Sequence, residues 1–393
     1  MTGTRARLVV RDVEALTPRG LTPATVVVEG GRIAAILPAD PAAAGDRLAV
    51  PGFVDLHVHG AAGVEATGGR DALRRLAAVL ASHGVTAFCP TAPAASPEVL
   101  REAVVGIAWA AEQSGRDGGD WEGARVVGAH LEGPYLSPVR RGAQPPGALR
   151  PPDLDEAARL YDLSRGTLRV MTLAPELPGA LELIRRLVGR GVVVAAGHTD
   201  ATYEQAAAGI AAGLRQSAHT FNGMRPFGHR DPGVLGAILD HDEVLAEVIA
   251  DGVHVDPRVV RLLVRVKGVR RVAVVTDLTH LAGLPPGDYE FAGSPVTVGP
   301  SGAFVKATGG LAGSVTPMNL AFANLLAWGF SVGEAASLTS GNARRQLGLP
   351  GPADALEEGL PADLTVIGRD GRVSLTLVGG RVVYAADPEE TGS

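Results

Sequence analysis

The sequence predicts an α/β fold, a (β/α)8 barrel of the TIM type with a small β-sandwich domain formed by both termini. Two observations carry this prediction. In the middle of the chain, short apolar runs end in acidic or imidazole side chains, at Asp55, His57, His59, Glu132, His198, His219 and Asp277. Such runs are typical of buried parallel strands, and a barrel gathers the residues that follow its strands at one face. Both ends of the chain, in contrast, are rich in strand patterns without intervening helices.

The strand patterns at the two ends predict one small domain. Residues 6–10, 24–29 and 32–37 are strand-like, and Gly30-Gly31 is a hairpin signal. Residues 364–367, 373–378 and 381–384 repeat this pattern at the C-terminal end. Neither part has enough strands for a core of its own. We therefore predict that residues 1–50 and 355–393 form the small β domain and that residues 51–354 form the barrel.

Helical patterns alternate with the central strands. They cover residues 71–83, 96–113, 179–190 and 203–212, and Gly84, Gly191 and Gly213 follow three of them as stop signals. The proline- and arginine-rich segment 134–153 follows Glu132 directly. A long loop beside a candidate ligand is typical of an active-site lid.

Composition narrows the class of protein. A formal net charge of −6 over 393 residues argues against nucleic-acid binding, which needs a basic face. No apolar run approaches the ~18 residues that a membrane span requires, and residues 1–10 lack the apolar core of a secretory signal. The single cysteine, Cys89, lies in a strand pattern and is expected to be a buried thiol. These features predict a cytoplasmic protein without nucleic-acid or membrane partners.

The residues at the strand ends have the chemistry of a metal site. His57 and His59 lie two apart, so a strand places both imidazoles on one side. Glu132 ends an apolar run, where a carboxylate is costly to bury unless it is paired or bound to a cation. With His198 and His219 it makes a Glu/His/His set, the usual form of a catalytic divalent site with one open position. Each histidine alone would more often be structural, and the joint pattern is the specific signal.

Asp277 is the candidate catalytic residue. A carboxylate beside a metal site can accept a proton from water and return it to a leaving amine. Metal-bound water reaches a pKa of about 7, so metal-activated hydroxide exists near neutrality. The alternative is that Asp277 is a structural ligand without acid/base duty. The sequence therefore predicts a metal-dependent hydrolase.

Longer motifs carry a family resemblance. They are Pro51-Gly52-Phe53-Val54-Asp55-Leu56-His57-Val58-His59, His130-Leu131-Glu132-Gly133-Pro134, Gly197-His198-Thr199-Asp200, His219-Thr220-Phe221-Asn222-Gly223 and Leu311-Ala312-Gly313-Ser314. In this order, over nearly the whole chain, they resemble the amidohydrolase superfamily and, within it, the N-acetylglucosamine-6-phosphate deacetylase family.

The resemblance implies a function and a set of roles. It implies hydrolysis of an amino-sugar phosphate, N-acetyl-D-glucosamine 6-phosphate, with Asp277 as general acid/base. Glu132, His198 and His219 would hold the main divalent ion, and His57 and His59 make a second ion plausible. Zn, Fe, Mn or Co suits such mixed imidazole and carboxylate ligands. The resemblance also implies a homodimer, with Arg230 as a phosphate ligand across its interface, and substrate contacts at Asn222, Arg230, His254, Gln144 and Leu311.

One stretch departs from the family pattern. Leu278-Thr279-His280 follows Asp277 where small residues are usual. Because these residues adjoin the candidate catalytic carboxylate, they put the identity of the substrate in question more than the reaction. Two alternatives stay open: a related enzyme for another N-acyl substrate, such as N-acetylgalactosamine 6-phosphate or a non-phosphorylated amide, and a catalytically silent barrel. The intact Glu132, His198, His219 and Asp277 argue against the silent barrel.

Overall fold

Eight parallel strands form the central barrel of the computed structural model, which describes residues 7–116, 119–299 and 302–387. Their hydrogen-bonded order is β5 (Phe53–Val58), β8 (Val85–Pro93), β10 (Ala129–Glu132), β11 (Leu168–Leu173), β12 (Val193–Ala196), β13 (Gln216–Ser217), β14 (Leu245–Ile249) and β15 (Val272–Val275). The barrel closes between its last and first strands through a parallel bridge from Val58 to Leu278, and Asp277 N donates to His57 O at 2.9 Å. Strand β9 (Arg125–Val126) pairs beside β8.

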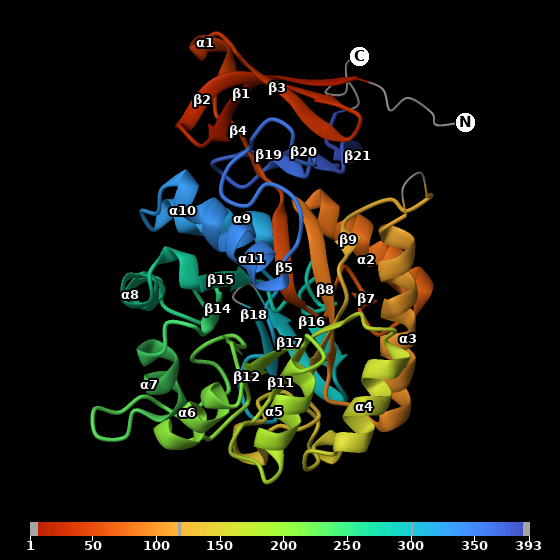
Figure 1. Ribbon diagram of the computed structural model, residues 1–393, viewed down its shortest axis with the longest axis vertical. Coiled ribbons are helices and arrows are strands. Elements are labelled where there is room, and N and C mark those ends of the chain that lie inside the picture. The colour runs from red at the N-terminus through yellow and green to blue at the C-terminus, as the bar shows by residue number, and fades with distance from the viewer. Residues whose placement is uncertain (1–6, 117–118, 300–301, 388–393) are drawn as a thin grey trace.

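Helices lie outside the strands (Figure 1). They are α2 (Arg70–Ser82), α3 (Pro97–Ser114), α4 (Leu154–Leu163), α5 (Ala180–Val188), α6 (Tyr203–Ala211), α7 (Gly233–Asp240), α8 (Pro257–Lys267), α9 (Met318–Ala327), α10 (Val332–Ala336) and α11 (Asn342–Leu347). The four helices predicted from the sequence are confirmed as α2, α3, α5 and α6, each with ends within two residues of the expected ones. Within the described part of the chain, no helix is both long and apolar enough to cross a membrane.

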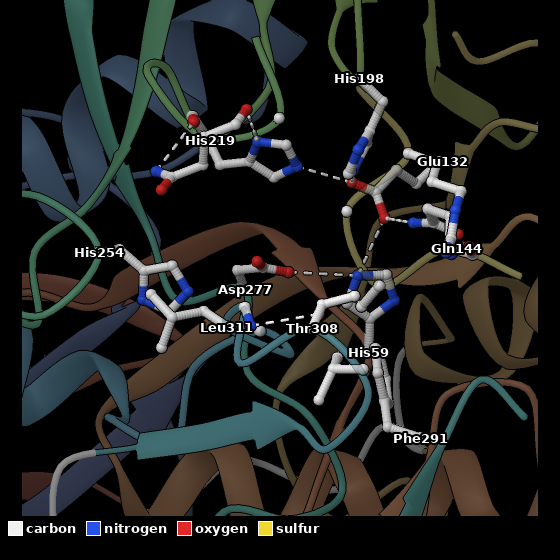
Figure 2. A pocket seen from close by; sticks show the side chains of 18 of the residues that line it. His59, Glu132, Gln144, His198, His219, His254, Asp277, Phe291, Thr308 and Leu311 are labelled. Atoms are coloured by element: carbon white, nitrogen blue, oxygen red, sulfur yellow. Dashed lines mark hydrogen bonds and ion pairs between the residues drawn. The ribbon is translucent and has the colours of Figure 1, made fainter. Parts of the chain in front are cut away.

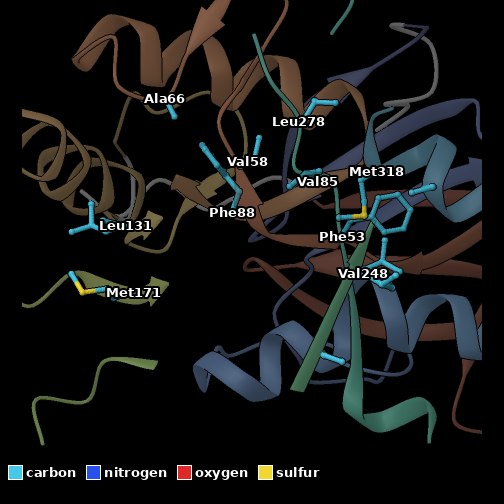
Figure 3. Packing of buried hydrophobic residues seen from close by; sticks show 14 of the residues in the cluster. Phe53, Val58, Ala66, Val85, Phe88, Leu131, Met171, Val248, Leu278 and Met318 are labelled. Carbon is cyan, nitrogen blue, oxygen red and sulfur yellow. The ribbon is translucent and has the colours of Figure 1, made fainter. Parts of the chain in front are cut away.

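Apolar side chains fill the space between the strands and this layer of helices. Figure 3 shows Phe53, Val85 and Met318 packed together, and the ring of Phe53 lies 5.3 Å from that of Phe322 on α9. Helix α5 buries Leu183, Ile184 and Leu187 along one face, as the 3.6-residue period requires. This packing holds the carboxyl ends of the strands in place.

Both ends of the chain build a second sheet, at the top of Figure 1. Its order is β21 (Arg381–Ala385), β20 (Val373–Val378), β19 (Leu364–Gly368), β4 (Arg47–Pro51), β1 (Leu8–Thr17), β2 (Gly20–Glu29) and β3 (Arg32–Pro38). Val13, Val26, Leu364 and Leu375 are buried in one cluster, so the core of this sheet needs both termini. The barrel and the two-ended β domain are therefore as predicted. Residues 1–6, where no secretory signal was expected, and 388–393 lie outside the described residues.

An antiparallel insertion follows the eighth barrel strand. Strands β16 (Gly287–Phe291), β17 (Ser294–Gly299) and β18 (Gly302–Val305) form it, and the sequence analysis assigns no element there. Phe291, Val296 and Ala303 pack in a separate small cluster with Leu281 and Ala312. These strands are short and partly exposed, so their alternation of apolar and polar residues is a weak sequence signal for a strand before the pairing partners are known. The insertion places Phe291 and Val305 at the mouth of the barrel.

Candidate metal centre and substrate cavity

Glu132 lies at the centre of the predicted site (Figure 2). It is the last residue of β10 and is 2% exposed. Its Oε1 lies 2.7 Å from His219 Nε2 and 3.0 Å from His198 Nε2, while its Oε2 lies 3.3 Å from His59 Nε2. The structure therefore places all four histidines predicted as metal ligands around the carboxylate of the fifth predicted ligand, Glu132.

His57 and Asp277 complete the cluster. His57 Nε2 lies 3.4 Å from Glu132 Oε1 and 3.6 Å from Asp277 Oδ1, and His59 Nε2 lies 3.2 Å from the same Asp277 oxygen. Two groups of three result, His57/His59/Asp277 and His57/Glu132/His219, with ligand atoms within 4.8 Å of one another in each. His57 belongs to both groups.

The cluster fits a divalent ion. His57 Nε2 is buried and has no hydrogen-bond partner among the described residues, although it faces two carboxylates. An unpaired buried ring nitrogen is costly, and coordination to a cation would satisfy it. Mixed imidazole and carboxylate donors suit Zn, Fe, Mn or Co. These residues form a candidate divalent metal site.

The backbone at this site is strained. His198, His219 and Asp277 have φ angles of 46°, 28° and 49°, in the left-handed region that residues with a Cβ rarely adopt. Each follows the end of a barrel strand, so the unusual turn redirects its side chain toward Glu132 or His59. Strained residues of this kind cluster at functional sites because the surrounding structure must hold them.

Burial and local charge act in opposite directions on the carboxylates. Burial disfavours ionisation of Asp277, but the hydrogen bond with His59 and the charges of His57 and His59 outweigh it, and the pKa falls to about 2. The pKa of Glu132 also lies well below its usual range, because His57 and His198 outweigh its burial. Both carboxyl groups are therefore ionised and able to bind a cation.

A cavity of about 440 Å³ opens above these residues. This volume is in the range that holds a small molecule. Four of the five residues predicted to contact substrate line it: Asn222, His254, Gln144 and Leu311. The segment 138–144, part of the predicted lid, forms one wall, and Phe291, Val305 and Thr308 form another.

Two of these residues are held by neighbours. Asp251 Oδ2 lies 2.7 Å from His254 Nδ1, which orients the imidazole at the cavity wall. Gln144 Nε2 donates to Glu132 Oε2, and its Oε1 accepts a hydrogen bond from Ala94 N at 2.9 Å. Gln144 therefore supports Glu132 as well as lining the cavity.

Arg230 is the predicted substrate-contact residue that lies away from the cavity of its own chain. It is exposed and does not line the cavity. It lies in a tight turn, where Gly228 N donates to Asp231 O at 3.0 Å, and this turn presents Arg230 to solvent.

The stretch that departs from the family pattern, Leu278-Thr279-His280, lies outside the substrate cavity. Leu278 and Thr279 are buried at the seam of the barrel. His280 pairs with Glu65 at 3.3 Å and lines a neighbouring cavity. None of the three lines the cavity above Glu132, so they do not shape its wall directly.

Sequence reasoning missed several supporting residues. Glu247 is fully buried on β14. The signal for Glu247 was a carboxylate inside the apolar run Leu245–Ile249. Phe291 and Thr308 reach the cavity from the insertion, which no sequence pattern indicated.

Comparison with known proteins agrees with this geometry. The amidohydrolase family profile matches residues 48–383. An N-acetylglucosamine-6-phosphate deacetylase of Bacillus subtilis (strain 168) is 35% identical over 343 residues, covering 86% of this chain and 85% of that protein. An N-acetylgalactosamine-6-phosphate deacetylase of Escherichia coli O157:H7 is 36% identical over 345 residues, covering 86% and 89%.

A solved structure extends the likeness to three dimensions. It is a variant N-acetyl-D-glucosamine-6-phosphate deacetylase from Mycobacterium smegmatis in complex with N-acetyl-D-glucosamine-6-phosphate. It aligns with a TM-score of 0.87 and 35% identity, over 98% of this chain and all of that one. With the barrel, the candidate metal ligands at the strand ends and this coverage, the chain belongs to the amidohydrolase family.

Proposed function

We propose that this chain deacetylates an N-acetylhexosamine 6-phosphate, with N-acetyl-D-glucosamine 6-phosphate as the preferred substrate, and releases acetate and D-glucosamine 6-phosphate. The observation that carries the proposal is the carboxylate of Asp277, which borders the substrate cavity 3.2 Å from His59 and beside the cluster around Glu132. The names of the relatives support the substrate class.

The chain's own residues supply the acid/base steps. Glu132, His57, His59, His198 and His219 would hold one or two divalent ions, which supply a Lewis acid for the amide carbonyl and acidify water. The Asp277 carboxylate accepts a proton from the attacking water. It then donates that proton to the amine nitrogen as the C–N bond breaks. His254 and Asn222 line the cavity and would orient the sugar there.

The reaction and the sugar are tested together. Acetate release is measured with N-acetylglucosamine 6-phosphate, its galactosamine isomer and unphosphorylated N-acetylglucosamine, and metal content is assayed on the same sample. We expect fast release from the first substrate alone. The E. coli relative named for the galactosamine isomer makes that sugar the second candidate. No release from any substrate by metal-loaded protein would contradict the deacetylase assignment.

Phosphate recognition is proposed to require a second copy of the chain. Arg230 suits a phosphate through its planar donors, yet it is exposed and away from the cavity of its own chain. Phe227, in the same loop, is 57% exposed. A homodimer that buries this loop would bring Arg230 of the partner subunit to the cavity.

Arg230→Ala is therefore expected to raise KM for the phosphorylated sugar by roughly 10-fold or more, as loss of a charge-assisted contact implies. Steady-state kinetics and light scattering measure the effect and the oligomeric state. Mixing Arg230→Ala with Asp277→Asn subunits should restore activity, because a mixed dimer contains one intact site. An unchanged KM would exclude the phosphate contact, and absence of restoration would exclude its supply by a partner.

Cytoplasmic placement is likewise a proposal, tested by fractionation.

A further inference from the structure

Glu247 is a buried carboxylate that the acid/base steps above do not use. It lies on β14 between buried apolar residues and is 0% exposed. Its Oε2 lies 3.2 Å from His57 Nδ1 and accepts the backbone N–H of His219, also at 3.2 Å. Its Oε1 accepts a hydrogen bond from Gln216 Nε2 at 2.5 Å. One carboxylate thus contacts two residues of the candidate metal centre.

The contact with His57 determines what that imidazole presents to the cavity. A carboxylate at Nδ1 retains the proton there, so the neutral form of the ring has its lone pair on Nε2 and can offer it to a cation. Nε2 is buried, has no hydrogen-bond partner among the described residues, and faces Glu132 and Asp277. Carboxylate–histidine pairs of this kind orient ligands and raise their basicity in metal sites.

A buried glutamate outside the candidate metal centre provides a contrast. Glu156, at the start of α4, receives hydrogen bonds from Tyr135 Oη at 2.9 Å and from Arg150 Nη2 at 2.7 Å. Its charge is balanced by a guanidinium. The side chain of Glu247 instead contacts the imidazole of His57, the amide of Gln216 and the backbone N–H of His219. His57 and His219 both belong to the candidate metal centre.

We propose that Glu247 is a positioning residue for the metal centre, which acts by orienting His57 and the turn at His219. This inference rests on the proposed metal-dependent function. It adds that a residue outside the cavity sets the affinity of the ion. Because Glu247 does not line the cavity, it acts through the two histidines and not through substrate.

Glu247→Gln isolates the charge from the hydrogen bonds. Gln216 Oε1 has no partner among the described residues, so rotation of the Gln216 amide lets this oxygen accept from the new amide. The oxygen of the substituted side chain would still accept from His219 N and His57 Nδ1. We expect the dissociation constant for Zn²⁺, measured on metal-free protein by competition with a chromophoric chelator, to rise ~10–100-fold. The melting temperature of the metal-free protein should stay close to that of the wild type.

Glu156→Gln is the matched control and should leave the Zn²⁺ dissociation constant unchanged. An unchanged constant for Glu247→Gln would overturn the proposal, as would a loss of stability without a loss of affinity. If Glu247→Gln does not fold, Glu247→Asp decides, because its shorter carboxylate lies farther from His57: weaker binding supports the proposal and equal binding overturns it. The readout is metal binding, so wild-type protein that binds Zn²⁺ without releasing acetate would contradict only the proposed substrate.

Discussion

Asp277→Asn is expected to lower kcat for acetate release by ~10²–10⁴-fold, the usual contribution of a general acid/base. The amide has the same shape as the carboxylate but cannot accept and return the proton. Glu132, His198 and His219 stay in place, so metal content should remain close to that of the wild type. Single-turnover acetate release and elemental analysis of the same sample measure both effects.

Asp162→Asn is the control for this prediction. Asp162 lies on α4, and its side chain is 71% exposed. Its replacement should change neither kcat nor metal content. Turnover of Asp277→Asn at the wild-type rate would remove the acid/base role, and loss of metal would instead make Asp277 a required ligand.

Arg344→Ala is expected to lower the free energy of unfolding by about 3–5 kcal/mol, the typical cost of removing one member of a buried ion pair. Arg344, on α11, is 1% exposed, and its Nη1 lies 3.4 Å from Asp363 Oδ2. It also donates to Pro350 O at 2.8 Å and to Thr86 Oγ1 at 3.0 Å. Asp363 precedes the first C-terminal strand and is fully buried, so the variant leaves this carboxylate with the partly exposed Arg125, at 3.4 Å, as its remaining cationic partner among the described residues.

The neighbouring arginine provides the control. Arg345 pairs with Asp354 at 2.7 Å, and both side chains are about one-third exposed. Arg345→Ala should cost no more than ~1 kcal/mol, as for other solvent-accessible pairs. Urea unfolding followed by circular dichroism compares the two variants. Equal midpoints would show that the buried pair at Arg344 contributes no more than the exposed one.

The candidate site residues could be located from the sequence, and the reason is energetic. Glu132, His198, His219 and Asp277 each follow an apolar run, and charged or polar groups are placed beside such runs only where they find partners. The parallel arrangement of the strands then brings their carboxyl ends to one face. Helical patterns of apolar residues predicted the four helices, and strand-like apolar runs predicted the strands of both termini.

Other parts depended on contacts between distant segments. The insertion over the cavity could not be predicted, because its strands are half exposed and acquire their register only from one another. Arg230 has a matching motif, yet its turn directs it away from the cavity of its own chain. Only the folded chain shows which surface a turn presents.

The fold class, the order of the candidate ligands at the strand ends and the family thus follow from the amino-acid sequence, since they depend on local burial patterns. Which side chains support those ligands depends instead on contacts across the barrel. Glu247 and His57 are 190 residues apart, and they meet because barrel closure places β5 and β14 on either side of β15. No local sequence pattern encodes the contact between these two side chains, because it follows from the closure and register of the whole barrel.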